Sequence, residues 1–370
     1  EDLDAYSSSC SSSRSPSPEL HQYDNGDTFV GKIDENGHRQ GRGVYTEKRS
    51  GSTYDGDFID SKRHGLGTLT IPGYLAYTGD FKDDLKDGRG KLVYKDSSCT
   101  YEGQFRLGVY HGHGTIKYND SRYYTGEWQN GKKHGDGKET YPDGSTFLGE
   151  FKDGKKHGVG TLLEKEGGQV LYSGKWKDDL WDGVGVQVER RPNVTDQEND
   201  KLKPRQQFQG SFLRGKRSGH GILTTSDGMI LEGYWHRDSP MAGKWNITYT
   251  DGTRFSGDAK VTSDSIIPFP HGHGTMDYGN GDFYKGNFKE GKRDGKGMCV
   301  YKNRDMWDGI WKDGSPDIDG GGVMVFNDGN VCKFYAPNQK QNEDETDQQD
   351  NQQNLEQQEI DDALLSPPIF

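Results

Sequence analysis

The chain is poor in hydrophobic residues and in cysteine, and it has no long apolar run. Only 29% of its 370 residues are hydrophobic, and the mean hydropathy is -1.06, so composition alone would favour disorder. Its four cysteines are scattered without paired spacing, which indicates neither a disulfide framework nor a zinc site. No stretch is long enough to span a bilayer and no secretory signal is visible, so we expect a cytoplasmic protein.

The chain carries almost no net charge in its middle. Its net charge is -12, but residues 339–370 hold nine acids and one base, and residues 1–22 hold four acids and one base. The remaining residues are nearly neutral. The acidic balance therefore says little about partners, and we expect no nucleic acid among them.

Glycine is abundant, and it recurs in a fixed context. A cassette of aromatic, any residue, Gly, any residue, aromatic returns twelve times at intervals near 23 residues, which indicates a repeat array. Nine copies are aromatic at both ends, and the copies at Phe29, Leu231 and Phe255 are degraded. The cassettes begin at Phe29, Tyr54, Tyr77, Tyr101, Tyr124, Phe147, Tyr172, Phe208, Leu231, Phe255, Tyr284 and Trp307.

A Gly-x-Gly element follows the cassettes at a nearly fixed distance and continues as x-apolar-x-Tyr in the best copies. All of these positions are two residues apart, which is the period of a strand. Each repeat is therefore predicted to be a hairpin with glycines and rings on one face. The other face is polar, and solvation is the expected role of its acids Asp57, Asp80, Glu127 and Glu150.

The glycines have a physical role in this arrangement. A glycine weakens a strand unless something must approach its backbone closely. Rings that lie across bare backbone would build a thin apolar layer on a single sheet. This would allow so polar a chain to fold.

The repeats resemble the MORN (membrane occupation and recognition nexus) repeat. The resemblance rests on copies such as Tyr54-Asp55-Gly56-Asp57-Phe58 followed by His64-Gly65-Leu66-Gly67-Thr68, and it spans residues 23–335. It implies an all-β fold: an elongated single-layer antiparallel sheet of about twelve stacked hairpins.

The array is interrupted and flanked by segments of different composition. The Ile-rich insertion is either a surface loop or a docking or capping tongue formed by Ile266, Ile267 and Phe269. We expect a disordered Ser-rich arm at 1–22, repeats 1–7 at 23–188, a polar loop at 189–207, repeats 8–12 at 208–335 with an insertion at 259–271, and a disordered Gln-rich acidic tail at 336–370.

Catalytic and metal chemistry find little support. The His-Gly-His stretches at 111–113 and 271–273 belong to the repeat pattern, and successive repeats are about 9–10 Å apart, too far for one metal ion to bridge. The Gly-x-Gly elements lack the context of nucleotide loops. We therefore expect no catalytic, cofactor-binding or metal-binding residues, and no enzyme.

The aromatic ladder is the first candidate site. Rings on a one-layer sheet serve as core and as surface, and a partly exposed apolar groove would receive an amphipathic partner helix. The candidate partner-binding groove comprises Tyr54, Phe58, Tyr77, Phe81, Tyr101, Phe105, Tyr124, Trp128, Phe147, Phe151, Tyr172 and Trp176.

Basic doublets form the second candidate. They occupy the same phase of their repeats and would line one margin of the sheet, either as solvated loops or as a weak site for anionic phospholipid. This candidate lipid-binding edge comprises Lys62, Arg63, Lys132, Lys133, Lys155, Lys156, Lys216, Arg217, Lys292 and Arg293.

The resemblance implies a non-enzymatic scaffold that binds protein partners in a cytoskeletal, axonemal, ciliary or membrane-proximal assembly. The alternative is the regulatory region of a longer enzyme, such as a SET methyltransferase, a phosphatidylinositol phosphate kinase or a GTPase exchange factor. The sequence does not indicate the oligomeric state.

Overall fold

The computed structural model describes residues 19–165, 168–189, 205–263 and 265–337, which divide into two compact units. The first unit runs to Ser226 and also takes in residues 236–238. Its strands are β1 (Glu19–Gln22), β2 (Thr28–Ile33), β3 (Arg39–Thr46), β4 (Thr53–Ile59), β5 (Lys62–Ile71), β6 (Leu75–Lys82), β7 (Leu85–Tyr94), β8 (Cys99–Arg106), β9 (Val109–Lys117), β10 (Tyr123–Gln129), β11 (Lys132–Thr140), β12 (Thr146–Lys152), β13 (Lys155–Leu163), β14 (Val170–Lys177), β15 (Leu180–Val188), β16 (Gln207–Leu213) and β17 (Lys216–Thr224).

The second unit comprises the remaining residues from Asp227 onward. A single 3₁₀ turn, η2 (Ile318–Gly320), is the only helical element in the described parts of the chain. The strands are β18 (Ile230–His236), β19 (Ser239–Pro240), β20 (Gly243–Thr248), β21 (Arg254–Lys260), β22 (Phe269–Asp277), β23 (Phe283–Lys289), β24 (Lys292–Val300), β25 (Met306–Lys312), β26 (Ser315–Pro316), β27 (Gly322–Val325) and β28 (Val331–Phe334).

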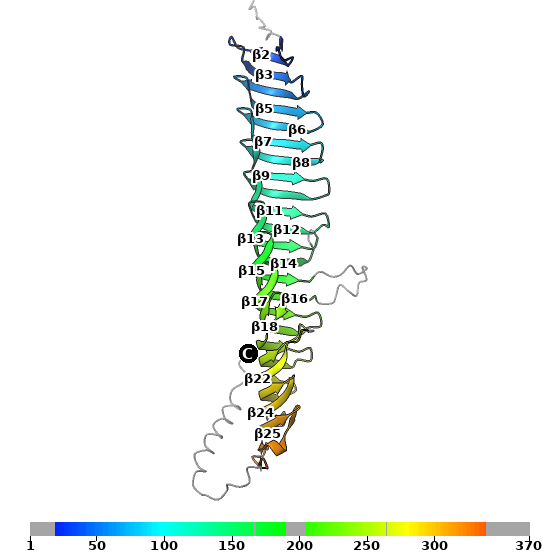
Figure 1. Ribbon diagram of the computed structural model, residues 1–370, viewed down its shortest axis with the longest axis vertical. Helices are drawn as coiled ribbons and strands as arrows, with labels where there is room; N and C mark the ends of the chain where they lie inside the picture. Colours follow the sequence, from blue (N-terminus) through cyan, green and yellow to red (C-terminus); the bar gives the residue numbers. More distant parts are fainter. Residues whose placement is uncertain (1–18, 166–167, 190–204, 264, 338–370) are drawn as a thin grey trace, which may run out of the picture. The chain divides into compact units, whose positions relative to one another are not determined.

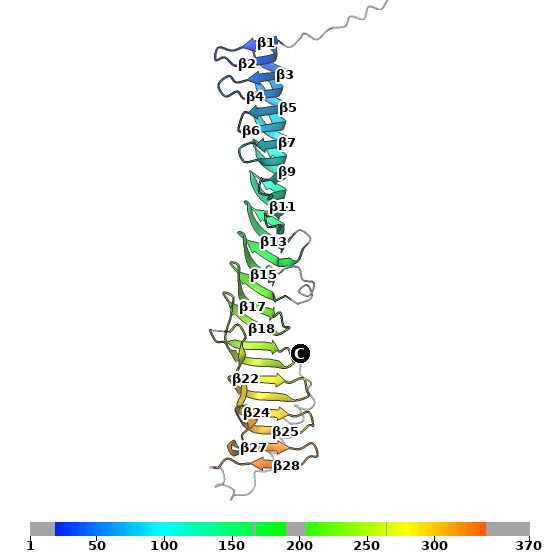
Figure 2. The ribbon, with the colours of Figure 1, turned by 90° about the vertical axis from the view of Figure 1, so that its right-hand side faces the viewer.

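Within each unit the strands pair antiparallel and in chain order. Figure 1 shows the strands of the first unit following one another in a single layer from β2 to β17. Figure 2 shows the same succession within the second unit from β22 to β28. Each cassette forms the first strand of one hairpin, as β4 does with β5 and β25 with β27. The predicted all-β antiparallel sheet of twelve hairpins is confirmed.

A row of glycines runs across the strands of the first unit, one on each strand from β2 to β17. Gly43 faces Gly56, Gly56 faces Gly67, and Gly67 faces Gly79 in consecutive pairs. The Tyr54 ring lies over two of them, so a Cβ added to Gly67 would come 2.4 Å from its hydroxyl oxygen. Glycine is therefore required here for close packing of ring on backbone.

The rings form one continuous edge-to-face chain on this side, which we call the ring face. Tyr54 contacts Phe58 of its own cassette and Phe81 of the next, with both pairs of centroids 5.0 Å apart and nearly perpendicular. Tyr77 repeats this with Phe81 and Phe105 at the same distance. Such geometry adds about 0.5–1.5 kcal/mol per pair beyond the burial of area. The core of each repeat is thus completed by its neighbour.

The boundaries of the array differ from the sequence prediction in two places. Residues 19–22 form strand β1, which pairs with β2 ahead of the first hairpin, so the N-terminal arm is shorter than expected. The insertion covers 261–268, because β21 continues to Lys260 and β22 begins at Phe269. Residues 1–18, 338–370 and most of the polar loop lie outside the described part of the chain.

Where the structure describes the chain, no helix is long and apolar enough to cross a membrane.

Candidate binding surface

The rings proposed as a partner-binding groove are buried. All twelve are at most 6% exposed, and the tyrosines of the set are at most 2% exposed. They form the core of the sheet, so the expectation of a partly exposed apolar groove was wrong. A partner on this face would therefore meet the side chains that cover the rings.

In most repeats the rings are covered by one side chain from the second strand of the hairpin, which we call the lid residue. Arg63 lies over Tyr54 and Phe81, with its guanidinium carbon 5.9 and 5.5 Å from the two ring centroids. Lys133 covers Tyr124 at 5.0 Å, and its side chain is only 16% exposed. Two lids in other repeats are aromatic. Tyr110 stacks on Tyr101 with centroids 3.7 Å apart, and Trp181 stacks on Tyr172 at 4.6 Å.

In each basic doublet of the candidate lipid-binding edge, only the second residue is a lid. The second residue of each doublet is half-buried over the rings, and burial lowers the pKa of Lys156. The first residue is exposed. Two of these exposed lysines form ion pairs, Lys216 with Asp238 and Lys292 with Asp313. The five half-buried lids are Arg63, Lys133, Lys156, Arg217 and Arg293, and the five exposed residues are Lys62, Lys132, Lys155, Lys216 and Lys292.

Each lid is also tied to the next hairpin through its backbone. The carbonyl oxygen of Arg63 accepts a hydrogen bond from the Asp84 N–H at 3.0 Å, and that of Lys156 accepts one from Asp179 at 3.1 Å. The same bond joins Lys133 to Gly154 at 2.9 Å. Neighbouring repeats are thereby locked together at the margin where the two strands of each hairpin connect, which we call the hairpin margin.

A β-bulge follows the glycine of most cassettes, and the tyrosine hydroxyl stabilises it. The register shifts between Gly79 and Phe81, and the Tyr77 hydroxyl donates to the bulge carbonyl of Asp80 at 2.9 Å. Burial raises the pKa of Tyr54 to about 12, and those of Tyr172 and Tyr284 likewise to about 12. The phenols are therefore neutral structural donors.

The acids after the cassette glycine are not simply solvated. The Asp80 carboxylate accepts the Arg89 N–H at 2.6 Å, and Glu150 accepts the Val159 N–H at 2.9 Å. Asp80 and Glu150 therefore each bridge the bulge to the following strand. The prediction of a polar face was right, but these carboxylates have a structural role that period-two alternation did not reveal.

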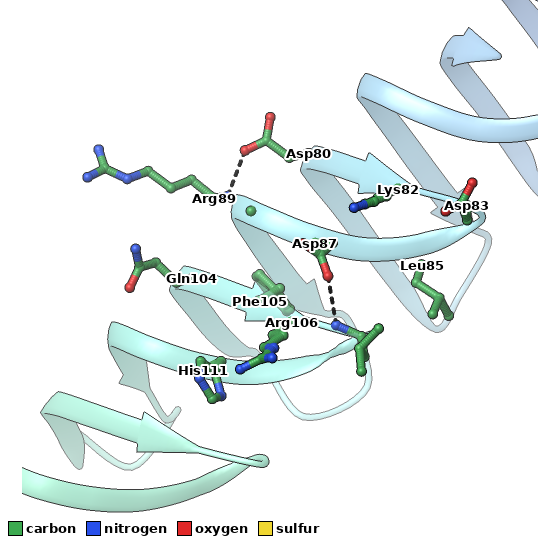
Figure 3. Close-up of a pocket in the computed structure, with 12 residues that line it drawn as sticks. Asp80, Lys82, Asp83, Leu85, Asp87, Arg89, Gln104, Phe105, Arg106 and His111 are labelled. Atoms are coloured by element: carbon green, nitrogen blue, oxygen red, sulfur yellow. Dashed lines mark hydrogen bonds between the residues drawn. The ribbon is translucent and has the colours of Figure 1, made fainter. Parts of the chain in front are cut away.

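The outer face, opposite the rings, is open and hollowed. One hollow lies across β6 to β9 beside the hairpin margin, where Leu85 and Asp87 line it (Figure 3). Leu107 also lines this hollow. The Asp87 carboxylate accepts the Leu107 N–H at 3.0 Å. Leu107 is 68% exposed and Leu85 is 43% exposed, so this margin carries accessible apolar groups. Sequence analysis did not single them out, although Leu85 occupies the phase in which other repeats have lysine.

Two further hollows lie next to each other on the outer face and share His113. One is floored by Gly79, Gly90 and Gly103, and the other by Gly114, Gly126, Gly137 and Gly149. These glycines belong to the glycine row, which the rings cover from the opposite side.

In the part of the chain that the structure describes, histidine and acidic side chains form no metal centre that the geometry favours. Among the described residues, the ligand atoms of Asp34, His38 and Asp60 lie within 4.8 Å of one another at exposed loops. Asp34 already accepts the N–H groups of Asn36 and His38 at 2.9 and 2.8 Å, which makes it a turn-forming residue. The cluster is explained by the loop that it builds.

Comparison with known proteins assigns the array. The MORN repeat pattern matches ten segments that together span more than half of the chain, and the longest gap between them falls between residues 230 and 269. The matched segments are 35–46, 54–74, 77–99, 101–121, 124–146, 147–163, 172–188, 208–230, 269–283 and 284–306.

No curated protein sequence matches the chain. A solved structure of a mutant TCP10 domain of Danio rerio CPAP is similar at 11% sequence identity and a TM-score of 0.15, covering 86% of this chain and 99% of that one. The chain belongs to the MORN repeat family.

Proposed function

We propose that this chain is a non-enzymatic scaffold that binds a protein partner, specifically an amphipathic helix, within a cytoskeletal, ciliary or membrane-proximal assembly. The observation that carries the proposal is that the two faces of the sheet differ. The ring face holds the entire aromatic core under its lids, and the outer face carries exposed side chains and open hollows. A partner that binds the outer face would leave the packed rings undisturbed.

The ladder of backbone hydrogen bonds supports the same proposal. The glycine row and the lid-to-turn bonds fix each repeat of the first unit against the next, so side chains on the outer face keep fixed spacings. Rigid spacing lowers the entropic cost of binding and favours an extended partner. A scaffold benefits from both properties.

Cross-linking mass spectrometry of the full chain with its native extract tests the proposal. We expect one or more proteins to be retained at stoichiometric levels, with cross-links from helical segments to lysines of the repeats. Cross-links confined to residues 1–18 or 338–370, or no stoichiometric partner, would contradict a scaffold built on the repeats.

A further inference from the structure

An apolar patch lies on the outer face of the second unit, over the strands from β23 to β28 (Figure 2). One column of paired residues crosses β23, β24, β25, β27 and β28 beside the turns that join successive repeats, and every member is apolar. Met298 and Val323 widen it in the neighbouring column. We call these seven residues the end patch. The column consists of Phe283, Val300, Met306, Val325 and Val331.

The same column has a different character in much of the first unit, where threonine is common. Thr46 faces Thr53 in register, and the hydroxyl oxygens of Thr140 and Thr146 lie 3.2 Å apart. In the second unit the column is still polar at Asp277 on β22 and becomes apolar on the next strand. The repeat pattern therefore does not require the apolar residues of the end patch.

The end patch also differs from the scattered apolar residues of the outer face. Leu66 pairs with Asp80 and Leu148 pairs with Lys138, so each of these exposed leucines has a charged neighbour. The members of the end patch face one another instead, and Val331 is 53% exposed. A contiguous apolar area with polar surroundings marks a binding site.

The end patch is too small for an untethered partner or a second copy. Four strand intervals of about 4.8 Å, and two residues along a strand, give it about 19 by 7 Å. That footprint of about 130 Å² is several-fold below the roughly 800 Å² that each partner buries in a stable complex. A segment tethered to the same chain needs far less area, because a short linker supplies an effective concentration in the millimolar range.

Residues 363–370 provide such a tethered segment. Their sequence, Ala-Leu-Leu-Ser-Pro-Pro-Ile-Phe, holds five apolar residues besides the prolines, whereas residues 338–362 hold only Leu355 and Ile360. Those 25 linking residues begin shortly after β28, where the end patch begins. A coil of 25 residues spans about 25–30 Å on average, so the segment can reach every strand of the patch.

The proline pair suits the segment to a surface whose backbone is already paired. The strands under the patch bond to one another, so an added strand would find no backbone partners there. Ser366-Pro367-Pro368 favours the polyproline II conformation, which needs no backbone hydrogen bonds.

The spacing of this conformation matches the spacing of the strands. Its three residues per turn place Leu364, Pro367 and Phe370 on one edge, about 9.3 Å apart. Two strands advance about 9.6 Å along the sheet. The three side chains would therefore meet alternate strands of the patch, namely β23, β25 and β28.

Charge favours an approach from the side of the hairpin margin. Residues 343–362 hold nine acids and no base. On that side, the two columns nearest the turn-side column hold three exposed lysines and one acid, Asp308. On the other side, the turn acids Asp282 and Asp305 accept backbone N–H groups of the following turns at 2.8 and 2.9 Å. The three lysines are Lys285, Lys296 and Lys333.

We propose that residues 363–370 bind the end patch of their own chain, as a polyproline II segment that crosses the strands from β23 to β28. The occupant and the surface both differ from those of the proposed scaffold function. Binding of the segment would leave the outer face of the first unit open to a partner.

Photo-cross-linking of the full chain tests the proposal. A benzophenone amino acid in place of Phe370 should react with the outer face of β23 to β28, and the main products should contain Met298 or Val325. Mixing chains of natural and heavy nitrogen separates a segment bound to its own chain from one bound to a second copy. We expect cross-links within single chains at micromolar protein.

Substitutions in the segment leave the packing of the array unchanged and provide a matched pair. Leu364→Asp puts a charge on the edge that faces the patch, and it should lower the cross-link yield by roughly fivefold or more because burial of the leucine is lost. Ser366→Asp adds the same charge on another edge and should change the yield by less than about twofold. On the array, Val331→Asp should act like Leu364→Asp, whereas Leu148→Asp in the first unit should have no effect.

Four results would overturn the proposal. They are cross-links between isotopically different chains, cross-links spread over other strands or the ring face, no cross-links at all, and equal yields from Leu364→Asp and Ser366→Asp. None of them decides the scaffold proposal, which has its own test with the native extract.

Discussion

Substituting a single glycine of the row by alanine should destabilise the sheet far more than its small size suggests. At Gly90 the added Cβ would lie 2.4 Å from the Tyr77 hydroxyl oxygen and 2.5 Å from two ring carbons. The ring cannot retreat, because Phe81 and Phe105 hold it edge-on at 5.0 Å from both sides. Overpacking of this kind costs about 1–3 kcal/mol.

Displacement of the ring would also break its hydrogen bond. The Tyr77 hydroxyl donates to the Asp80 carbonyl at 2.9 Å, and such a bond contributes about 0.5–1.5 kcal/mol. Together the two effects predict a loss of about 2–4 kcal/mol for Gly90→Ala. Hydrogen exchange of the β6 and β7 amides should measure it locally, since long repeat arrays need not unfold in one step.

A neighbouring residue and a second substitution control the interpretation. Lys91→Ala changes the exposed residue next to Gly90 and should cost less than about 0.5 kcal/mol. Tyr77→Leu removes the ring, so Gly90→Ala should cost less in that background than in the natural chain. If Gly90→Ala is as mild as Lys91→Ala, or if Tyr77→Leu gives no relief, the close-packing account of the glycine row is refuted.

Three further outcomes follow from the lids, the phenols and the exposed lysines. Lys156→Ala should cost about 1–2 kcal/mol, because Lys156 Nζ lies 5.2 Å from the Trp176 ring, whereas the adjacent exposed Lys155→Ala should be nearly neutral in urea unfolding. Burial holds the pKa of Tyr54 at about 12 against the ordinary 10.0, so its contribution to stability is complete below pH 10 and is lost as pH rises through about 12. Ultraviolet titration should therefore show delayed phenolate formation in the folded chain, and a normal titration would contradict the burial. Lys132→Glu/Lys155→Glu should reduce sedimentation with phosphatidylserine vesicles at low salt by several-fold, at about 1 kcal/mol per charge, and unchanged sedimentation would leave these lysines as solvated loops.

The repeat architecture could be predicted because it depends on local periodicity alone. The spacing of Tyr54, Gly56 and Phe58 specifies a strand with one packed face, and the interval to Tyr77 specifies the repeat. The antiparallel hairpins follow from these two facts. Each cassette has the same spacing, so degraded copies such as the one at Leu231 still form a strand with the same packed face. Leu231 itself is fully buried.

Exposure could not be predicted in the same way. It depends on how the lids close over the rings, and the lids belong to a part of the repeat interpreted as a charged loop. The signal was nevertheless present: Arg63 precedes Gly65 by two residues, so it shares the face of Gly65 and Gly67. Applied to Lys133 and Lys156, the same rule would have placed them over the rings. The bulge contacts of Asp80 and Glu150 could not be predicted from the sequence pattern, because a bulge breaks the two-residue period of the strand.

The glycine row has a consequence for how such a chain can change over generations. On the ring face these glycines leave no room for a Cβ, so nearly every substitution of one of them should destabilise the sheet. The opposite side faces solvent and bears none of that constraint, apart from carboxylates such as those of Asp80 and Glu150 that hold the bulges. Sequence variation is therefore best tolerated on the outer face, where exposed side chains can be replaced one at a time while the packed rings and glycines are unaltered.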